Sequence, residues 1–345
     1  MLLLCRLGAY REAYGNDESS ALNLSVHGRT MNSGILEGAL FRRKVEMAVI
    51  NFGSINIDHV YHVEHFVRPG ETLASTKYSQ LLGGKGANQS IALACAGADV
   101  KHVGAIHQSD AAFKQTLIRH GVDCQYMACG ETPSGHAIIQ VTPSGENAIV
   151  LFGGANQTIT DATVRKALSD TTSADWVLTQ NETSSIADIL SQAKEKGLKV
   201  AFNPAPMSES VKSLPLECVD LLIVNETEAA AITGKDEFED IISWFKENWK
   251  HGEVILTMGK DGVMMLRKSG DIIKVDAFTV DAVDTTAAGD CFIGYFLSAY
   301  SNHTDAKQAL VRGCAASAIA VTREGAAQSI PQQKEVDRFL AKHAR

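Results

Sequence analysis

A carboxylate beside a run of small residues is the feature of this sequence most able to do chemistry. Asp290 ends the segment DTTAAGD at 284–290, and an apolar, helix-like stretch follows it. Ala287, Ala288 and Gly289 leave room for a ligand to approach the backbone. At the start of a helix, their N–H groups and the helix dipole would attract an anion. Asp290 could then accept the proton of an alcohol that attacks a phosphoryl group.

Taken alone, Asp290 is open to a plainer interpretation. An acidic residue in the first turn of a helix stabilises that helix through its dipole, and for an isolated aspartate this structural role is the commoner one. A catalytic role for Asp290 therefore needs support from other parts of the chain.

A second polar segment, GGKGANQ at 83–89, is rich in glycine and precedes another helix-like stretch. The glycines permit close approach of the backbone to a ligand, while Lys85 and Asn88 offer donors to hydroxyl groups. The spacing does not match a P-loop. Gln89 stands where a dinucleotide fingerprint needs glycine, which disfavours a nucleotide-dependent dehydrogenase. On its own, such a segment is more often a turn than a binding site.

Composition and charge exclude several classes of function. The chain has 345 residues, of which 45% are apolar and 21% charged, as is usual for a soluble globular protein. The net charge is -8 and no Lys/Arg-rich run occurs, so a nucleic-acid partner is not expected. No apolar run is long enough to cross a bilayer, so no membrane partner is expected. Seven cysteines without a C-x-x-C pair indicate reduced thiols and a cytoplasmic location.

Alternating apolar and amphipathic segments predict an α/β fold. Amphipathic segments such as Ser185–Lys196 are predicted helices, as are Asp305–Thr322 and Lys334–Lys342. Repeated strand–helix units predict a mostly parallel sheet flanked by helices, with ligands at the carboxyl ends of the strands. The predicted buried strands are Val45–Phe52, Val100–Ile106, Trp176–Thr179, Lys199–Phe202, Asp220–Val224 and Glu253–Thr257.

Two other segments, at about 57–82 and 135–152, alternate polar and apolar residues around turns. This is the pattern of β-hairpins that have one solvated face. The turns are marked by Pro69-Gly70 in the first segment and by Pro143-Ser144-Gly145 in the second. Together the hairpins predict one small antiparallel sheet. Because an exposed sheet edge can pair with another chain, we expect a homodimer through this sheet.

Residues 1–45 differ in composition from residues 46–345, which carry the predicted domain. They contain Gly, Ser, Asn and mixed charges without sustained periodicity, so we expect a disordered N-terminal extension. Arg6, Arg11 and Arg29 suit an organellar transit peptide, but Glu12, Asp17 and Glu18 argue against one, since such peptides avoid acids.

The two motifs, in this order, resemble the two signatures of the ribokinase-like carbohydrate kinases. The resemblance covers about residues 46–345, and the co-occurrence of both signatures makes it specific. It implies that family's fold, in which the small antiparallel sheet is a lid that closes over the sugar and excludes water. Other segments that carry the resemblance are GSINID at 53–58, GEN at 145–147, NPAP at 203–206, NETE at 225–228 and TMGKDG at 257–262.

The resemblance also implies a reaction. The chain would use ATP to phosphorylate D-ribose at its primary 5-hydroxyl, giving ribose 5-phosphate and ADP. Asp290 would be the base, and the backbone of residues 287–289 would form the anion hole for the transferred phosphoryl group. A relative acting on deoxyribose, fructose or adenosine is an alternative. A non-catalytic sugar-binding regulator on the same fold is another, although the residues for catalysis are all present.

Binding roles follow from the same resemblance. Asn225 and Glu228 form an N-x-x-E motif that would help to position Mg²⁺ and phosphate. The same pair has the spacing of a helix cap, and both roles can hold together. The sugar hydroxyls would be held by Asn56, Asp58, Gly84, Lys85, Asn88, Glu146 and Asp290. The nucleotide would be held by Asn203, Asn225, Glu228, Thr257, Gly259 and Gly262.

A monovalent-cation site is the last feature that the resemblance implies. K⁺ would be held by the Asp284 carboxylate and by carbonyl oxygens of the loop at 320–329, which suit a large and weakly hydrated ion. Such an ion could order the anion hole without touching the substrate. The alternative is an ordinary loop that ends a helix at Gly325. The expected ligands are Asp284, Thr286, Ala320, Arg323, Gly325 and Ser329.

Overall fold

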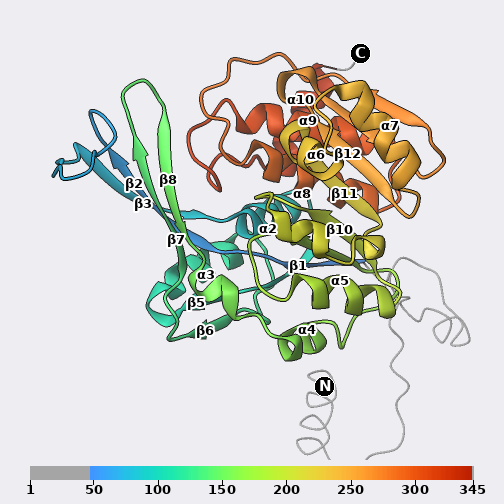
Figure 1. Ribbon diagram of the computed structural model, residues 1–345, viewed down its shortest axis with the longest axis horizontal. Coiled ribbons are helices and arrows are strands. Elements are labelled where there is room, and N and C mark those ends of the chain that lie inside the picture. The colour runs from blue at the N-terminus through green and yellow to red at the C-terminus, as the bar shows by residue number, and fades with distance from the viewer. Residues whose placement is uncertain (1–46, 344–345) are drawn as a thin grey trace, which may run out of the picture. The chain divides into compact units, whose positions relative to one another are not determined.

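A computed structural model of the chain describes residues 47–343, and the predicted extension at 1–45 lies outside them. The centre of the structure is an eight-stranded sheet of order β14-β13-β12-β11-β10-β9-β1-β4 (Figure 1). Strands from β12 to β4 pair in parallel, whereas β13 and β14 extend the sheet antiparallel. The strands are β1 Ala48–Phe52, β4 Asp99–Val103, β9 Trp176–Gln180, β10 Lys199–Asn203, β11 Leu221–Asn225, β12 Glu253–Thr257, β13 Val263–Leu266 and β14 Ile272–Val275. The predicted mostly parallel α/β sheet is confirmed.

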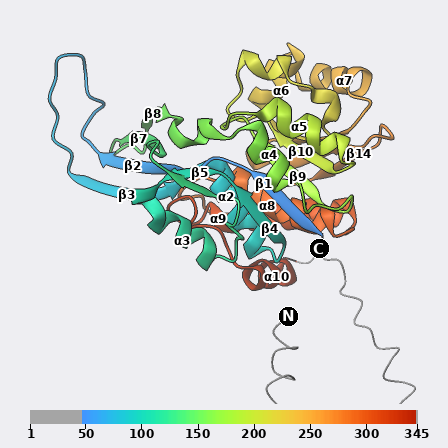
Figure 2. The same ribbon diagram turned by 90° about the horizontal axis from the view of Figure 1, so that it is seen from below.

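Helices cover both faces of this sheet (Figure 2). Because successive strand residues point to opposite faces, Val49 of β1 lies in one hydrophobic core and Ile50 in the other. The first core contains residues of α2, α3, α8, α9 and α10, and the second contains residues of α4 to α7. The helices are α2 Lys85–Cys95, α3 Ala111–Arg119, α4 Asp161–Ala167, α5 Ile186–Glu195, α6 Glu226–Thr233, α7 Phe238–Asn248, α8 Ala288–Ser301, α9 Ala306–Ala320 and α10 Gln333–Lys342.

The sequence predicted one strand at 100–106, but the structure breaks it at Gly104 into β4 and β5. A side chain at Gly104 would meet the His102 ring at 2.7 Å and the Gly53 carbonyl at 2.8 Å, so the backbone passes its neighbours closely here. Strand β5, Ala105–His107, pairs in parallel with β6, Ala128–Gly130. Short 3₁₀ helices are η2 Gln108–Asp110, η3 Gly154–Thr158, η4 Glu209–Ser213, η5 Leu216–Cys218 and η6 Gly259–Asp261.

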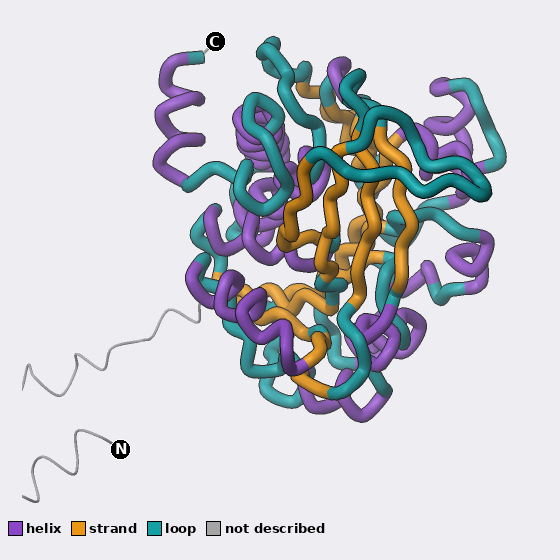
Figure 3. Tube along the Cα trace, turned by 90° about the vertical axis from the view of Figure 1, so that its left-hand side faces the viewer, coloured by secondary structure: helices purple, strands orange, loops and turns teal. Residues whose placement is uncertain are grey.

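A four-stranded sheet, here called the lid, projects from one side of the body, and helices surround the main-sheet strands (Figures 1 and 3). Its order is β3-β2-β7-β8, and each hairpin is antiparallel as predicted. The two hairpins are joined, however, by a parallel pairing of β2 with β7, which the sequence analysis did not expect. Both strands start at the body, with Asn56 opposite Gly135, and run outward side by side. The lid strands are β2 Asn56–His62, β3 Lys77–Gly83, β7 Gly135–Val141 and β8 Asn147–Phe152.

The parallel strands bring polar residues to one edge of the sheet. Asn203, Asn225 and Thr257 are the last residues of β10, β11 and β12, and Asn225 stands opposite Thr257 in the strand register. This edge is where ligands bind in open α/β sheets. Across residues 47–343, no helix is both long enough and apolar enough to span a membrane.

Candidate active site

Asp290, in the first turn of α8, is held by two side-chain amides. Asn88 Nδ2 donates to Oδ2 at 3.1 Å, and Gln89 Nε2 donates to Oδ1 at 2.9 Å. Both amides belong to α2, so these bonds join the two glycine-containing motifs although Asn88 is 202 positions away. Burial raises the pKa of Asp290 to about 6, against the charge of Lys85 and the two amide bonds. Such a carboxylate is ionised at neutral pH and still accepts a proton readily.

The start of α8 offers backbone donors next to this carboxylate. Ala287 caps the helix with a φ of 58°, in the left-handed region, and the helix begins at Ala288. The N–H of Ala288 donates to the Thr285 carbonyl at 3.2 Å, so the free first-turn donors are those of Gly289 and Asp290 among residues 47–343. A side chain at Gly289 would meet no atom within 4 Å, so the space beside these donors is open.

A cavity of about 230 Å³ lies where α8 begins. Residues that the sequence assigned separately to the sugar, the phosphate and the nucleotide share its wall. They come from the ends of three parallel strands and from the first turns of α2, α6 and α8. Its polar and small lining residues are Lys85, Asn203, Asn225, Glu228, Thr257, Thr285 and the segment 287–290.

The base of the lid supplies further polar groups. Asn56, at the start of β2, accepts a hydrogen bond from Asn156 Nδ2 at 2.8 Å, and Asn156 Oδ1 accepts one from the Ile55 N–H at 2.9 Å. Burial and then the charge of Glu182 raise the pKa of Asp58 to about 7. Asn88 Oδ1 is buried without a partner among residues 47–343, which leaves it available to a ligand hydroxyl.

Lys85 is the cation at the centre of these carboxylates. Gly84, with a φ of 91°, caps α2 and places Lys85 in its first turn. Burial opposes the lysine charge, but Asp290, Glu182 and Glu228 outweigh it and raise the pKa of Lys85. Lys85 therefore remains protonated and lowers the cost of gathering negative groups in one buried place.

Glu182 also lies at this site, although the sequence did not predict it. It follows β9, and its Oε2 accepts hydrogen bonds from Ser54 Oγ and from the Lys85 N–H, the latter at 3.1 Å. No glycine-rich motif surrounds it. The signal that could have found it is its place just beyond the carboxyl end of a predicted parallel strand, where ligand-binding residues gather.

Glu146, which the sequence assigned to the sugar, lies elsewhere. It is exposed in the turn between β7 and β8, where its carboxylate accepts a hydrogen bond from Ser144 Oγ at 3.2 Å. This turn is the outer end of the hairpin, whereas Gly135 and Asn56 lie at its base. The structure therefore does not bring Glu146 to the other predicted sugar residues.

Asn225 and Glu228 form the helix cap that their spacing predicted. The Glu228 N–H donates to Asn225 Oδ1 at 2.8 Å, and the Asn225 N–H donates to Glu228 Oε2 at 3.0 Å. Both residues also line the cavity. Burial raises the pKa of Glu228, against the hydrogen bond from Asn225 and the charge of Lys85.

The remaining nucleotide candidates lie around the same strand ends. Asn203 Nδ2 donates to the Ile223 carbonyl at 2.9 Å, which ties β10 to β11 at the cavity. Gly259 and Gly262 form the turn after β12, with φ of 53° and 93°. A side chain at Gly262 would meet the Val275 carbonyl at 2.2 Å, so this turn requires glycine.

The predicted cation ligands are divided between two neighbouring loops. The Asp284 N–H donates to the Val321 carbonyl at 3.1 Å, just beyond Ala320 at the end of α9. Asp284 accepts hydrogen bonds from the N–H groups of Thr286 and Gly325 at 2.8 and 2.9 Å. Burial alone would raise the pKa of Asp284, but these bonds outweigh it and lower the pKa.

Two other predicted cation ligands shape the loop after α9. The Arg323 guanidinium forms an ion pair with Glu335, so the backbone carbonyl of Arg323 is the group it can offer to a cation. Ser329 is buried, and its hydroxyl donates to the Ala326 carbonyl at 2.8 Å.

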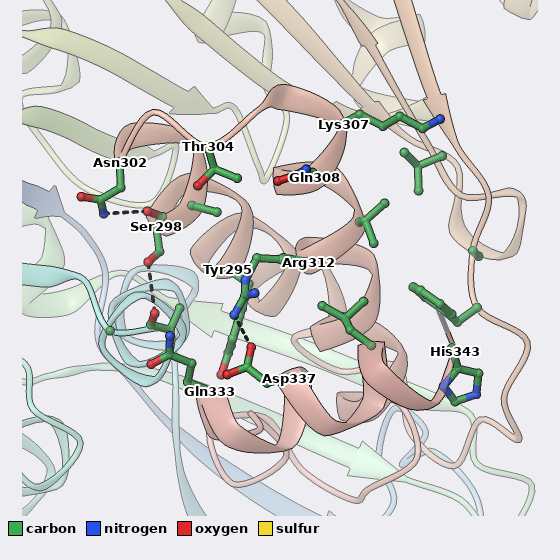
Figure 4. Close-up of a pocket in the computed structure, with 18 of the residues that line it drawn as sticks. Tyr295, Ser298, Asn302, Thr304, Lys307, Gln308, Arg312, Gln333, Asp337 and His343 are labelled. Atoms are coloured by element: carbon green, nitrogen blue, oxygen red, sulfur yellow. Dashed lines mark hydrogen bonds and ion pairs between the residues drawn. The ribbon is translucent and has the colours of Figure 1, made fainter. Parts of the chain in front are cut away.

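A larger cavity, of about 1160 Å³, lies among α8, α9 and α10 (Figure 4). It contains none of the predicted site residues. Some of its polar groups bond within its wall: Arg312 pairs with Asp337 at 2.6 Å, and Asn302 donates to the Ser298 carbonyl at 2.9 Å. We therefore place the candidate active site in the smaller cavity at the start of α8.

Comparison with known proteins shows the family to which the chain belongs. Residues 48–333 match the family described as pfkB family carbohydrate kinase. The chain belongs to the pfkB family of carbohydrate kinases. It is 38% identical over 297 residues to the ribokinase of Haemophilus influenzae, covering 84% of this chain and 96% of that protein. The family membership makes the chain a carbohydrate kinase, a phosphotransferase.

Two solved ribokinase structures are similar over most of the chain. The ribokinase of Cryptococcus neoformans var. grubii, in complex with ADP, is 31% identical with a TM-score of 0.76, and 85% of this chain and 99% of that chain are covered. The ribokinase of Arabidopsis thaliana, complexed with ribose and ATP, is 26% identical with a TM-score of 0.75, and 86% and 98% are covered. The ribokinase-like fold is thus confirmed.

Proposed function

We propose that this pfkB-family kinase transfers the terminal phosphoryl group of ATP to the 5-hydroxyl of D-ribose, with Asp290 as the general base. The observation that carries the proposal is the joining of the two motifs: amides from GGKGANQ fix Asp290 beside the first turn of α8. The similarity to ribokinases, including one described with ribose and ATP, supports ribose as the sugar and ATP as the donor.

The reaction is an in-line displacement. Asp290 accepts the proton of the 5-hydroxyl while the oxygen forms its bond to phosphorus and the bond to the departing ADP oxygen breaks. The free N–H groups of Gly289 and Asp290 stabilise the charge on the transferred phosphoryl group. The products are ribose 5-phosphate, with its proton left on Asp290, and ADP.

The sugar is held by both donors and acceptors. Asp58 and Glu182 accept hydrogen bonds from hydroxyl groups, and Lys85 donates to them. Asn88 accepts through the Oδ1 that has no partner among the described residues. A polyol that fills these positions satisfies buried polar groups that would otherwise stay unpaired, and this supports selectivity for a sugar of matching hydroxyl pattern.

Two ions complete the proposed site. Glu228 uses Oε2 in the helix cap, which leaves Oε1 to hold Mg²⁺ or one of its waters, with Asn225 beside it. Mg²⁺ neutralises charge on the phosphates during transfer. The carboxylate of Asp284 and the carbonyl oxygens of the loop that follows Ala320 suit K⁺. Equal rates of ribose phosphorylation in sodium and in potassium would exclude a K⁺ site there.

We also propose that the protein forms a homodimer through the lid. Strand β8 is an edge strand, and Ile149, Val150 and Leu151 are 55%, 68% and 49% exposed. An exposed apolar edge strand is suited to pairing with a second copy. Sedimentation should give a dimer for the native chain and a monomer for Ile149→Lys; a native monomer would contradict the proposal.

A reducing compartment, the cytoplasm, is our proposed location. All six cysteines among residues 47–343 are free thiols, and four of them are buried. Free thiols are typical of proteins kept under reducing conditions. A fluorescent fusion found in an oxidising compartment would contradict this location.

A substrate panel tests the proposed reaction. The native chain is assayed with ATP and ribose, deoxyribose, fructose or adenosine, and the phosphorylated position is found by NMR. We expect the highest kcat/KM for ribose and phosphate on its 5-oxygen. A tenfold or greater preference for another acceptor, or phosphate at another oxygen, would refute the assignment.

A further inference from the structure

A chain of buried side chains continues behind Asp290, away from the cavity. Gln89 leads from Asp290 to Gln180, the last residue of β9, and Gln180 leads to Asn51 of β1. All three amide side chains are fully buried, at 0% exposure. Asn51 continues through Ser90 to His102, with bonds of 2.8 Å at each step. None of these side chains lines the cavity.

The Asp290 end of the chain dictates how Gln89 is turned. An ionised carboxylate accepts hydrogen bonds but donates none, so Gln89 must present its NH₂ group to Asp290. Its carbonyl oxygen then faces away and needs a donor. Gln180 Nε2 supplies that donor at 2.7 Å.

The other end dictates the same orientation for Gln180. The Gly86 carbonyl, in the first turn of α2, accepts a hydrogen bond from Asn51 Nδ2 at 2.9 Å. Asn51 Oδ1 must therefore accept, and Gln180 Nε2 donates to it at 3.0 Å. Both hydrogens of one NH₂ group are thus committed. Gln180 Oε1 is left buried with no partner among residues 47–343, a cost that calls for an explanation.

We propose that Gln180 is a positioning residue for the kinase reaction: it fixes Gln89 with its NH₂ group towards Asp290 and, through Asn51, ties the base to the backbone of Gly86 at the start of α2. This inference rests on the proposed role of Asp290. Without the Gln180 donor, the carbonyl oxygen of Gln89 is left buried without its partner, and the NH₂ group is held by Asp290 and, at 3.4 Å, by Asn203 Oδ1. Movement of Gln89 to satisfy that oxygen would cost the carboxylate one of its two side-chain donors.

Other charged groups near Asp290 are already accounted for. Lys85 favours its ionised form and Glu182 disfavours it, and neither contacts Gln180 through a hydrogen bond among those of residues 47–343. At the far end, burial lowers the pKa of His102 to about 4, so this ring is neutral at working pH. A change at Gln180 therefore reaches Asp290 through the orientation of Gln89 rather than through a new charge nearby.

The test uses the full chain with Gln180→Met. Methionine donates no hydrogen bond, introduces no charge and is close to Gln in shape. Loss of a donor disfavours the ionised form of Asp290 and raises its pKa. We therefore expect the acid limb of the kcat–pH profile to shift to higher pH by about one unit. We also expect kcat at neutral pH to fall about tenfold, with the KM for ATP unchanged.

Thr179→Val is the matched control. Thr179 is the preceding residue of β9, is also fully buried, and donates to the Phe52 carbonyl at 3.0 Å without reaching Asp290. This variant should lower thermal stability but leave the acid limb in place. The inference is overturned if Gln180→Met folds and keeps both its acid limb and its kcat at native values, as Thr179→Val does.

A double variant separates positioning from a general loss of packing. If Gln180 acts through Gln89, then Gln89→Met/Gln180→Met should lower kcat no further than Gln89→Met alone. If the losses of kcat from the two single variants instead multiply in the double variant, the inference is contradicted. The two hypotheses can fail separately. An active Asp290→Asn variant would refute Asp290 as the base. An inactive Asp290→Asn variant together with a native-like Gln180→Met variant would refute only the positioning role of Gln180.

Discussion

The two halves of the active site are built in different ways. The phosphate half is one continuous segment, 284–290, that uses small residues and backbone N–H groups at the start of α8. The sugar half is assembled from side chains of separate segments: Asp58 on β2, Lys85 on α2 and Glu182 after β9. A contiguous backbone site can be recognised from local sequence. A site made of scattered side chains depends on topology, which places the segments together.

The two halves also differ in charge. Around the sugar position, Asp58, Glu182 and Asp290 crowd near the single cation Lys85. Burial and then the charge of Glu182 raise the pKa of Asp58 to about 7, whereas the phosphate half relies on neutral N–H donors. The carboxylates of the sugar half therefore repel one another, and hydroxyl groups of a bound sugar would relieve this repulsion by donating hydrogen bonds to them. The phosphate half has no such repulsion among its N–H donors.

Asp290→Asn, at the boundary of the two halves, has the largest expected effect. The amide keeps the shape of the carboxylate but cannot take the 5-hydroxyl proton. We expect kcat to fall by about a thousandfold or more. Calorimetry should find ribose affinity within about fivefold of the native value, because the other sugar residues remain. Turnover within tenfold of native would show that this carboxylate is not the base.

In the phosphate half, Gly289→Val should block transfer without harming the fold. A side chain at Gly289 meets no atom within 4 Å, so it extends into the space left for the phosphoryl group. We expect kcat to fall about a hundredfold with little change in Tm. Gly294→Ala, five residues along the same helix, is the control. There a side chain would meet Ala92 Cβ at 2.3 Å, so we expect a lower Tm instead. A native kcat for Gly289→Val would refute the anion hole.

For the sugar half, Glu182→Gln and Glu146→Gln form a matched pair. Glu182 contacts Ser54 and Lys85 inside the site, whereas Glu146 is exposed at the outer turn of the lid. Loss of the Glu182 charge should raise the KM for ribose about tenfold. Glu146→Gln should change it less than about twofold. A larger rise in the KM for ribose in Glu146→Gln than in Glu182→Gln would mean that the turn between β7 and β8 contacts the sugar.

The smallest effect is a pH-dependent gain of stability in Asp58→Asn. The pKa of Asp58 is about 7 in the folded state against an ordinary 3.8, so the folded chain binds this proton more tightly than the unfolded chain. Stability is therefore lost as pH rises from about 4 to 7. Asparagine does not ionise, so the ribose-free variant should have a Tm a few degrees above native at pH 8 and close to native at pH 4. Equal differences at both pH values would contradict a raised pKa.

The same contrast explains what could be predicted from the sequence. Apolar runs and amphipathic segments were sufficient for the parallel sheet, because their period is local. The parallel join of β2 with β7 was missed, since pairing between hairpins is set by where the strands leave the body. Strands β13 and β14 were also missed, because strands of four residues carry little periodic signal.

Site residues could likewise be predicted only where a local motif marks them. The link of Asp290 to Asn88 was expected from two recognisable motifs, and their contact spans 202 positions. Glu182 was missed and Glu146 was placed with the sugar instead, because both are single carboxylates whose position only the tertiary structure decides. Gln180 is the last residue of β9 and belongs to no recognisable motif, so its link to Asp290 had no local signal.

A crystal structure with ribose and a non-hydrolysable ATP analogue tests the central claim most directly. We predict the ribose 5-oxygen within hydrogen-bond distance of the Asp290 carboxylate, facing a terminal phosphate held at the N–H groups of Gly289 and Asp290. A 5-hydroxyl turned away from Asp290, or a terminal phosphate bound away from the start of α8, would contradict it.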